Sequence, residues 1–329
     1  MRKFIFNIGS FLLSTCVAYV LCTFLWMHFI PFDLIKKNAP YPYREKGFSF
    51  ERLQEIKMQR EIDLLFLGSS HAYRGFDTRL FQLNDITSFN LGSPSQTPIQ
   101  TLFLLEKHLD QLDPHMVILE VYPATFQNDG VESTLDIIAN SEITPSLFEM
   151  CFKVNHIKTY HALMYDLFVE FLELTPRWNP SSNASDKYVS GGYVQSQTIN
   201  NLSPVTNKMR KNWDNRKWQM HQSQLKAFED ILNLLKAREI DFALVQNPVT
   251  REAYELYNNN SEIDSLFRTF GPYFNMNQLV QLDDNTDFID YHHMSQTGVE
   301  KTCKEVIEIL KSNSSLLSAT FGSSDTKPL

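Results

Sequence analysis

The first 32 residues constrain the chain most, because 29 consecutive positions among them carry no charge. Arg2 and Lys3 are charged, and the next charged residue is Asp33. Positions 11–30 read FLLSTCVAYVLCTFLWMHFI, and a helix of about 20 residues, rising about 1.5 Å per residue, spans the hydrocarbon of a bilayer. A cleaved signal peptide has a shorter apolar region and a small-residue cleavage site after it, and no such site follows here. We therefore expect an uncleaved single-pass anchor.

The charges that flank this segment predict its orientation. Arg2, Lys3 and the α-amino group favour a cytoplasmic N-terminus, because short positive flanks stay on that side. Four basic residues between 36 and 46 weaken the asymmetry, but long domains translocate largely regardless of their own charge. We expect the cytoplasmic membrane as the location, with the N-terminus inside and the body outside the cytoplasm.

The charge of the body limits its partners. Without Arg2 and Lys3 the chain has 28 basic and 38 acidic residues, a net charge of −10. Its one basic cluster, between 208 and 217, is a short surface patch, and nucleic-acid binding is not expected because neutralising phosphates requires a broad basic face. Four cysteines are too few for a disulfide-built scaffold, and the sequence leaves open whether Cys151 and Cys303 pair.

Short apolar runs alternate with amphipathic segments through the body. We expect strands at 62–67, 89–92, 116–121, 242–245 and 279–282, and helices at 50–58, 97–112, 225–236 and 297–311. A helix pair is expected at about 146–174, and the polar stretch 178–207 is expected to be a long surface excursion or a lid. Strands that read as continuous apolar runs favour a parallel sheet covered on both faces.

Three turns place reactive side chains where such a sheet concentrates its functional groups, at the carboxyl ends of strands. Residues 68–71 (Gly-Ser-Ser-His) follow the first strand, residues 90–95 follow the second, and residues 290–298 precede the last helix. A serine hydroxyl becomes nucleophilic when a neighbouring base accepts its proton. His293 can be that base for Ser70, and Asp290 can orient the imidazole.

The same turns offer groups that bind a developing oxyanion. The backbone N–H groups of Ser70 and Gly92 are the expected donors, each worth about 100–1000-fold in rate. Gly92 has no Cβ, which would let a substrate oxygen approach its backbone. We expect no metal: a calcium loop starting at Asp283 would need Gly and Glu where Phe288 and Met294 stand, and no convincing Cys/His set for zinc is present. No cofactor is expected.

These motifs resemble the SGNH (GDSL-type) hydrolase superfamily. The segment 290–298, DYHHMSQTG, is similar to its last block, D-x-x-H-[LM]-[NS]-x-x-G, and the resemblance covers about 60–311. It implies a three-layer flavodoxin-like α/β fold with a parallel sheet, here preceded by one transmembrane helix. With the anchor, the chain looks like the D-alanyl transfer protein of teichoic acid modification and the alginate O-acetylation proteins. That likeness implies ester chemistry on a cell-envelope polymer and a membrane-bound O-acyltransferase as partner.

The resemblance also implies roles for single residues. Ser70 is the nucleophile, with Asp290 and His293 as the other triad members, and Gly92 is an oxyanion donor. The family's third block normally supplies an Asn as a further donor, but residues 119–123 here read LEVYP. We expect either that Asn90 or the Tyr122 hydroxyl substitutes for it, or that the oxyanion hole has only two donors. Further residues beside the motifs are candidates for substrate binding: His71, Tyr73, Arg74 and Tyr122.

The expected organisation has four parts. Residues 1–32 form a stub and anchor, 33–60 a juxtamembrane connector, 61–312 the catalytic domain with a helical and loop insertion at about 127–215, and 313–329 a tail. The predicted function is acyl transfer to water or to a glycan hydroxyl through an acyl-serine intermediate. Two alternatives remain open at the level of sequence, namely a non-catalytic accessory protein of an acyltransferase system and an envelope deacylase. An α/β-hydrolase elbow is disfavoured, because almost no sheet precedes Ser70.

Overall fold

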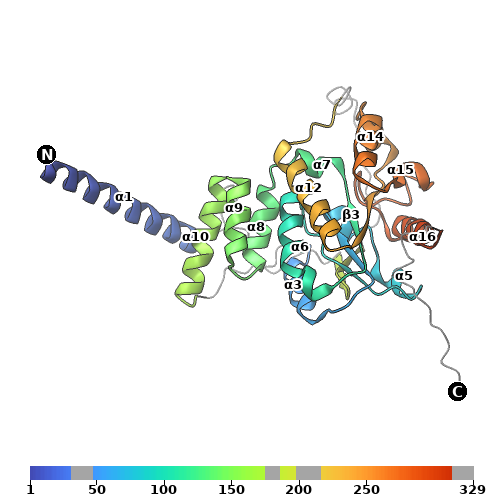
Figure 1. Cartoon of the computed structure of the whole chain (residues 1–329), viewed down its shortest axis with the longest axis horizontal. Coiled ribbons are helices and arrows are strands. Elements are labelled where there is room, and N and C mark those ends of the chain that lie inside the picture. The colour runs from blue at the N-terminus through green and yellow to red at the C-terminus, as the bar shows by residue number, and fades with distance from the viewer. Residues whose placement is uncertain (31–46, 175–185, 198–215, 313–329) are drawn as a thin grey trace, which may run out of the picture.

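The chain folds into a body that carries one projecting helix. A computed structural model describes residues 1–30, 47–174, 186–197 and 216–312. Residues 33–46 of the expected connector, the expected tail and most of the basic cluster lie outside these ranges. Helix α1 (Arg2–Phe29) is long and apolar enough to cross a membrane, and its C-terminal end lies against α10 (Figure 1).

A five-stranded parallel sheet forms the centre of the body. Its order is β2-β1-β3-β6-β7, and all four neighbouring pairs are parallel. The strands are β1 (Leu64–Leu67), β2 (Ser88–Asn90), β3 (Met116–Glu120), β6 (Asp241–Gln246) and β7 (Tyr273–Asn275). Counted along the chain this is the order 2-1-3-4-5, that of flavodoxin-like doubly wound sheets. The predicted three-layer α/β fold is confirmed.

Alternate residues of the strands enter two separate cores. Leu65 and Leu67 of β1 pack with α6 (Pro98–Leu112) and α12 (Gln222–Ala237), whereas Leu64 and Phe66 pack with α16 (Gln296–Ser312). Side chains of successive strand residues point to opposite faces, so continuous apolar strands require helices on both sides, as Figure 1 shows. Cys151 lies in the first core and Cys303 in the second, and both are free.

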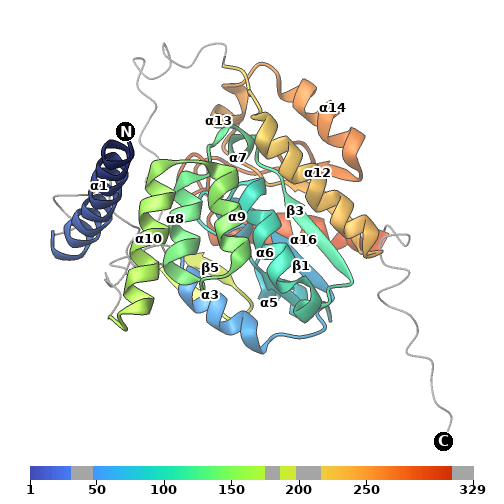
Figure 2. The ribbon, with the colours of Figure 1, turned by 60° about the vertical axis from the view of Figure 1, so that its left-hand side comes forward.

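The remaining helices are short or belong to the insertion. They are α3 (Ser49–Glu55) with a 3-10 turn (Ile56–Met58), α4 (Ser70–Tyr73), α5 (Thr78–Gln82), α7 (Pro123–Gln127), α8 (Val131–Asn140), α9 (Pro145–Val154), α10 (Ile157–Phe171), α13 (Arg251–Glu255), α14 (Asn260–Phe270) and α15 (Met276–Leu279). The expected helix pair at 146–174 is present as α9 and α10. Together with α8 these helices stand side by side next to α6 (Figure 2).

One predicted strand is wrong. Residues 279–282 were expected to close the sheet, but β7 lies six residues earlier and pairs Phe274 with Val245. The Asn275 side chain accepts a hydrogen bond from Asn277 N–H at 3.1 Å and so starts α15. Leu279 is 49% exposed, because this apolar residue belongs to a short surface helix rather than to the buried sheet.

Part of the polar stretch 178–207 is a hairpin that supports the end of β2. Strands β4 (Asp186–Val189) and β5 (Tyr193–Ser196) pair antiparallel around a turn at Gly191 and Gly192. The N–H of Asn90 donates to Gly191 O at 2.7 Å. The guanidinium of Arg52, which is buried, donates to Gly192 O at 2.9 and 3.1 Å. In the part that the structure describes, the stretch expected to be a surface excursion or a lid is therefore a hairpin that supports the carboxyl end of β2.

The turn predicts a sharp sensitivity at Gly192. Its φ is +87°, and a Cβ there would lie 2.1 Å from Asn90 O. We expect Gly192→Ala to lower the free energy of unfolding by at least about 2 kcal/mol through backbone strain and displacement of β2. Thermal unfolding of the purified chain in detergent measures this. Gly9→Ala is the control, because nothing lies within 4 Å of a Cβ at Gly9; equal melting temperatures for the two variants would contradict the account.

Candidate active site

Ser70 stands at the first residue of α4, directly after the end of β1. Gly68 makes the turn with φ +143°, and a Cβ there would lie 2.8 Å from the Cβ of Glu120. Ser69 caps the helix, since its Oγ accepts from His71 N–H at 3.2 Å. The chain order reverses between β1 and β3, and ligands bind at such a switch point outside the carboxyl ends of the strands. The fold thus places Ser70 where a doubly wound sheet binds its ligands.

The structure brings Ser70, His293 and Asp290 together. The Oγ of Ser70 lies 2.8 Å from Nε2 of His293, and Nδ1 of His293 lies 2.9 Å from Oδ2 of Asp290. These are the two hydrogen bonds that a nucleophile, a base and an orienting carboxylate require. The serine and the histidine are 223 positions apart in the chain.

Asp290, in the loop before α16, accepts hydrogen bonds that keep it ionised. Partial burial alone would raise the pKa of Asp290, but hydrogen bonds from the His293 ring and from the N–H groups of His292 and His293 hold it well below its usual value. The two N–H groups donate to Oδ1 of Asp290 at 2.8 Å each. Asp290 is therefore ionised at any working pH and can stabilise a charged imidazole.

Two further histidines surround His293, but neither can replace it. His71 is buried against the ring of Tyr122 at 4.0 Å, and burial together with His293 and His292 lowers its pKa well below the ordinary value. His292 keeps an exposed edge, its Nδ1 lies 3.1 Å from the Tyr122 hydroxyl, and the partial desolvation of its ring together with His293 lowers its pKa as well. No hydrogen bond joins either ring to a carboxylate within the described chain.

Two buried asparagines clamp α4 from opposite sides. Asn90 donates to Ala72 O at 2.8 Å and to Phe76 O at 3.3 Å, and Asn247 donates to His71 O at 2.8 Å. Asn247 was missed in the sequence, although it directly follows β6 and therefore stands at a carboxyl strand end like the other site residues. Both clamps hold backbone carbonyls of the segment that begins with Ser70.

This clamp corrects two expectations about the oxyanion donors. The amide hydrogens of Asn90 are already bound, so Asn90 is not a donor to substrate. Gly92 N–H donates to Asn90 Oδ1 at 3.1 Å, and a Cβ at Gly92 would lie 3.0 Å from Ala72 Cβ and from two backbone oxygens. Close packing against the α4 turn, not substrate approach, requires glycine there. The N–H of Ser70 has no acceptor in the part of the chain that the structure describes.

Tyr73 and Arg74, expected to bind substrate, have other partners. Arg74 forms an ion pair with Asp186 of β4 at 2.6 Å, and its interactions with the neighbouring Tyr73 and with the Asp186 carboxylate outweigh burial and raise its pKa. Tyr73 is buried with the guanidinium of Arg52 4.9 Å from its ring centroid. Both residues attach α4 to its supports. His71, Tyr122 and His292 remain beside the triad.

Glu120 stands where the resembling family has an asparagine. It lies buried at the end of β3, behind Gly68, and accepts a hydrogen bond from Ser69 Oγ at 3.3 Å. Burial raises its pKa to about 8, against the hydrogen bond from Ser69. Its Oε1 has no partner among the described residues. Glu120 is thus a mostly neutral carboxyl group under the Ser69–Ser70 turn at pH 7.

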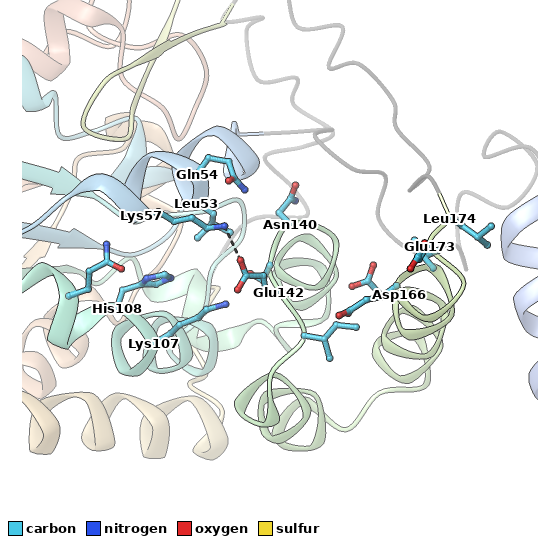
Figure 3. A pocket seen from close by; sticks show the side chains of 15 residues that line it. Leu53, Gln54, Lys57, Lys107, His108, Asn140, Glu142, Asp166, Glu173 and Leu174 are labelled. Carbon is cyan, nitrogen blue, oxygen red and sulfur yellow. Dashed lines mark hydrogen bonds and ion pairs between the residues drawn. The ribbon is translucent and has the colours of Figure 1, made fainter.

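A large cavity lies elsewhere, between α3, α6 and α10 (Figure 3). It has a volume of about 980 Å³, and its wall includes the ion pair of Lys57 with Glu142 at 2.9 Å. None of the triad residues lines it. Within the described ranges no cluster of three or more His, Cys, Asp or Glu is arranged to hold a metal ion.

Solved structures similar to this chain share few of its residues. No protein-family model and no curated protein matches the chain. Among solved structures, a candidate acylhydrolase from Bacteroides fragilis is similar with a TM-score of 0.40 and 11% identity, over 82% of this chain and 99% of that one. A GDSL-like lipase from Bacteroides thetaiotaomicron has a TM-score of 0.40 and 12% identity, over 81% and 98%. Similarity this distant says nothing about chemistry, which has to come from the residues of this chain.

Glu120 predicts how stability depends on pH. Its pKa is about 8 in the folded chain against an ordinary value of 4.5, so between these values the folded state keeps a proton that the unfolded state has released. Stability therefore falls as pH rises from about 4.5 to 8, by about 1.4 kcal/mol for each pKa unit that is realised. Glu120→Gln, which cannot ionise, should lose much less melting temperature between pH 5 and pH 8. An identical loss in both proteins would refute the buried neutral carboxyl.

Proposed function

We propose that the chain is a membrane-anchored serine acyl-transfer enzyme of the SGNH type, working through an acyl-Ser70 intermediate. One observation carries the proposal, namely the pair of hydrogen bonds that joins Ser70, His293 and Asp290 at 2.8 and 2.9 Å. An ester hydrolase is the simplest form of this chemistry. An O-acyltransferase shares its first half and differs in the acceptor.

The first half-reaction follows from the contacts. Nε2 of His293 takes the proton of Ser70 as Oγ attacks the ester carbonyl, and Asp290 stabilises the imidazolium. The tetrahedral oxyanion collapses, the ester C–O bond breaks, and His293 returns the proton to the leaving alcohol. In the second half, water or an acceptor hydroxyl gives its proton to His293 and attacks the acyl-Ser70 carbonyl. Ser70 is then regenerated, and an acid or a new ester leaves.

The free N–H of Ser70 supports stabilisation of the oxyanion in both halves. The N–H of Gly92 would serve as a second donor if the substrate oxygen shared or replaced its bond to Asn90. On the other side of Ser70, the aromatic surface of His71, Tyr122 and His292 is the proposed contact for the rest of the substrate. The stacking of His71 on Tyr122 fixes that surface.

The anchor gives the proposal its setting. If α1 spans the cytoplasmic membrane with the N-terminus inside, Ser70 works at the outer surface of that membrane. An ester-bearing cell-envelope polysaccharide or polymer is the proposed substrate, and a membrane-bound O-acyltransferase is the proposed partner. The body's net charge of −10 means that an anionic polymer would need local contacts to bind.

A non-catalytic accessory role is the second candidate. Two observations favour it. The N–H of Gly92 already has an acceptor, and the strand end at Glu120 supplies no asparagine. An accessory protein would bind an acylated polymer at the same surface and leave the ester intact. An envelope deacylase, in contrast, differs from the main proposal only in the use of water as acceptor, and analysis of products with candidate glycans separates the two.

Replacement of the nucleophile is the first test. We expect Ser70→Ala to lower turnover of p-nitrophenyl acetate by roughly 1000-fold or more, because the attacking oxygen is lost. Ser69→Ala is the matched control: it removes a cap and the bond to Glu120, at a cost of about 1 kcal/mol in stability, and should keep turnover within about tenfold. Equal turnover in Ser70→Ala and the wild-type protein would reject the assignment.

The orienting carboxylate gives a second test. Asp290→Asn keeps the shape of the side chain but cannot stabilise an imidazolium, so we expect kcat to fall by about 100- to 10,000-fold with little change in KM. The His292 ring lies next to His293 but makes no hydrogen bond to a carboxylate within the described chain, so the main effect of His292→Ala should be on KM. The contrary result, a larger kcat loss for His292→Ala than for Asp290→Asn, would make His292 the base.

A further inference from the structure

One flank of α10 is apolar, exposed and free of charge. Its exposed residues are Ile157, Leu167 and Phe171, and the partly buried Met164 lies on the same side. Ile157 is 54% exposed, Leu167 39% and Phe171 82%. At about 100° per residue, Asp166 lies at least about 100° around the helix from each flank residue, whereas Glu170 lies about 60° from Leu167 and borders the flank.

The strip of α10 beside this flank is covered by α1. The hydroxyl of Tyr19 lies 2.5 Å from Nε2 of His161, and the ring of Phe24 packs on Phe168 at 5.0 Å and on Tyr165 at 5.9 Å. Phe24 and Met27 are buried by this contact. The exposed flank of α10 is therefore continuous with the surface that the apolar helix covers.

The length of α1 shows where this contact lies. The helix has 28 residues, about 42 Å, whereas about 20 residues, or about 30 Å, cross the hydrocarbon. Residues 1–19 are all exposed, and burial begins at Val20. With about residues 4–23, next to Arg2 and Lys3, in the hydrocarbon instead of 11–30, the buried Phe24 and Met27 lie in the C-terminal excess, where the helix leaves the bilayer. Figure 1 shows α10 running across that end of α1.

We infer that α10 rests on the bilayer that α1 enters, with Ile157, Met164, Leu167 and Phe171 inserted among the lipids at its surface. This rests on α1 spanning the membrane, as proposed above. An amphipathic helix of this kind buries its apolar face about 5–10 Å into the boundary between headgroups and acyl chains. Lipid is the fitting occupant because the flank has no charge and continues the surface of the spanning helix. The contact orients the body, and with it the Ser70 site, relative to the membrane.

Spin-label accessibility in the full-length chain tests this. Cys16 and Cys22 are replaced by Ala, single cysteines are introduced at position 167 or 171, and the labelled protein is placed in nanodiscs of phosphatidylcholine and phosphatidylglycerol. Collisions with oxygen report lipid, and collisions with a water-soluble nickel chelate report solvent. Leu83→Cys is the aqueous control, because Leu83 is 80% exposed near α5, and Leu13→Cys is the hydrocarbon control.

We expect labels at 167 and 171 to prefer oxygen over the chelate by several-fold relative to position 83. Collision with the chelate at the rate of position 83 would overturn the inference, and so would shielding from both reagents, which indicates a protein partner or a second copy. Chelate access at position 13 would instead overturn the spanning assignment of α1, and the inference with it. Esterase activity of the same samples is an independent readout, so loss of the lipid contact and loss of the proposed chemistry are distinguishable.

Discussion

The contact between Ser70 and His293 is the one on which the rest of the site depends. It joins the first strand turn of the body to the loop before its last helix, 223 residues apart, and neither segment reaches the other without the parallel sheet between them. The short helix α4 must therefore be held in place. Asn90 and Asn247 bind its carbonyls from two strand ends, and the β4–β5 hairpin supports the strand that carries Asn90. Much of the buried polarity around the sheet's carboxyl edge serves to fix one serine.

Two carboxyl groups near that serine have opposite environments. Asp290 accepts three N–H donors and keeps a low pKa, whereas the burial of Glu120 outweighs the hydrogen bonds from Ser69 and from neighbouring backbone N–H groups and raises its pKa to about 8. Environments that separate pKa values in this way indicate different roles. The charged carboxylate holds the His293 ring, and the neutral one fills the space under the Ser69–Ser70 turn without placing a second negative charge beside Ser70.

The sequence predicted the fold class and singled out the three residues that the structure joins by hydrogen bonds, because each depends on a local signal: apolar runs of strand length, a Gly-Ser-Ser turn, and Asp-x-x-His before a helix. It failed where a polar side chain makes the decisive contact, whether with a near neighbour or with a distant segment. The last strand was placed at 279–282 because hydropathy does not show that Asn275 starts a helix. Arg74 was read as a substrate contact because Asp186, its partner, lies 112 residues away. Asn247 carried a usable signal, its place after an apolar strand, whereas nothing in the sequence showed that Asn90 would bind Gly92.

The central claim is that Ser70 is chemically activated in the membrane-anchored protein. The most direct measurement is covalent labelling of the full-length chain with a fluorophosphonate, followed by mass spectrometry of its peptides. The account predicts one adduct, on Ser70 and not on the adjacent Ser69, and its loss in His293→Ala protein that remains folded. An unlabelled Ser70 in folded wild-type protein, or labelling that persists without His293, would contradict it.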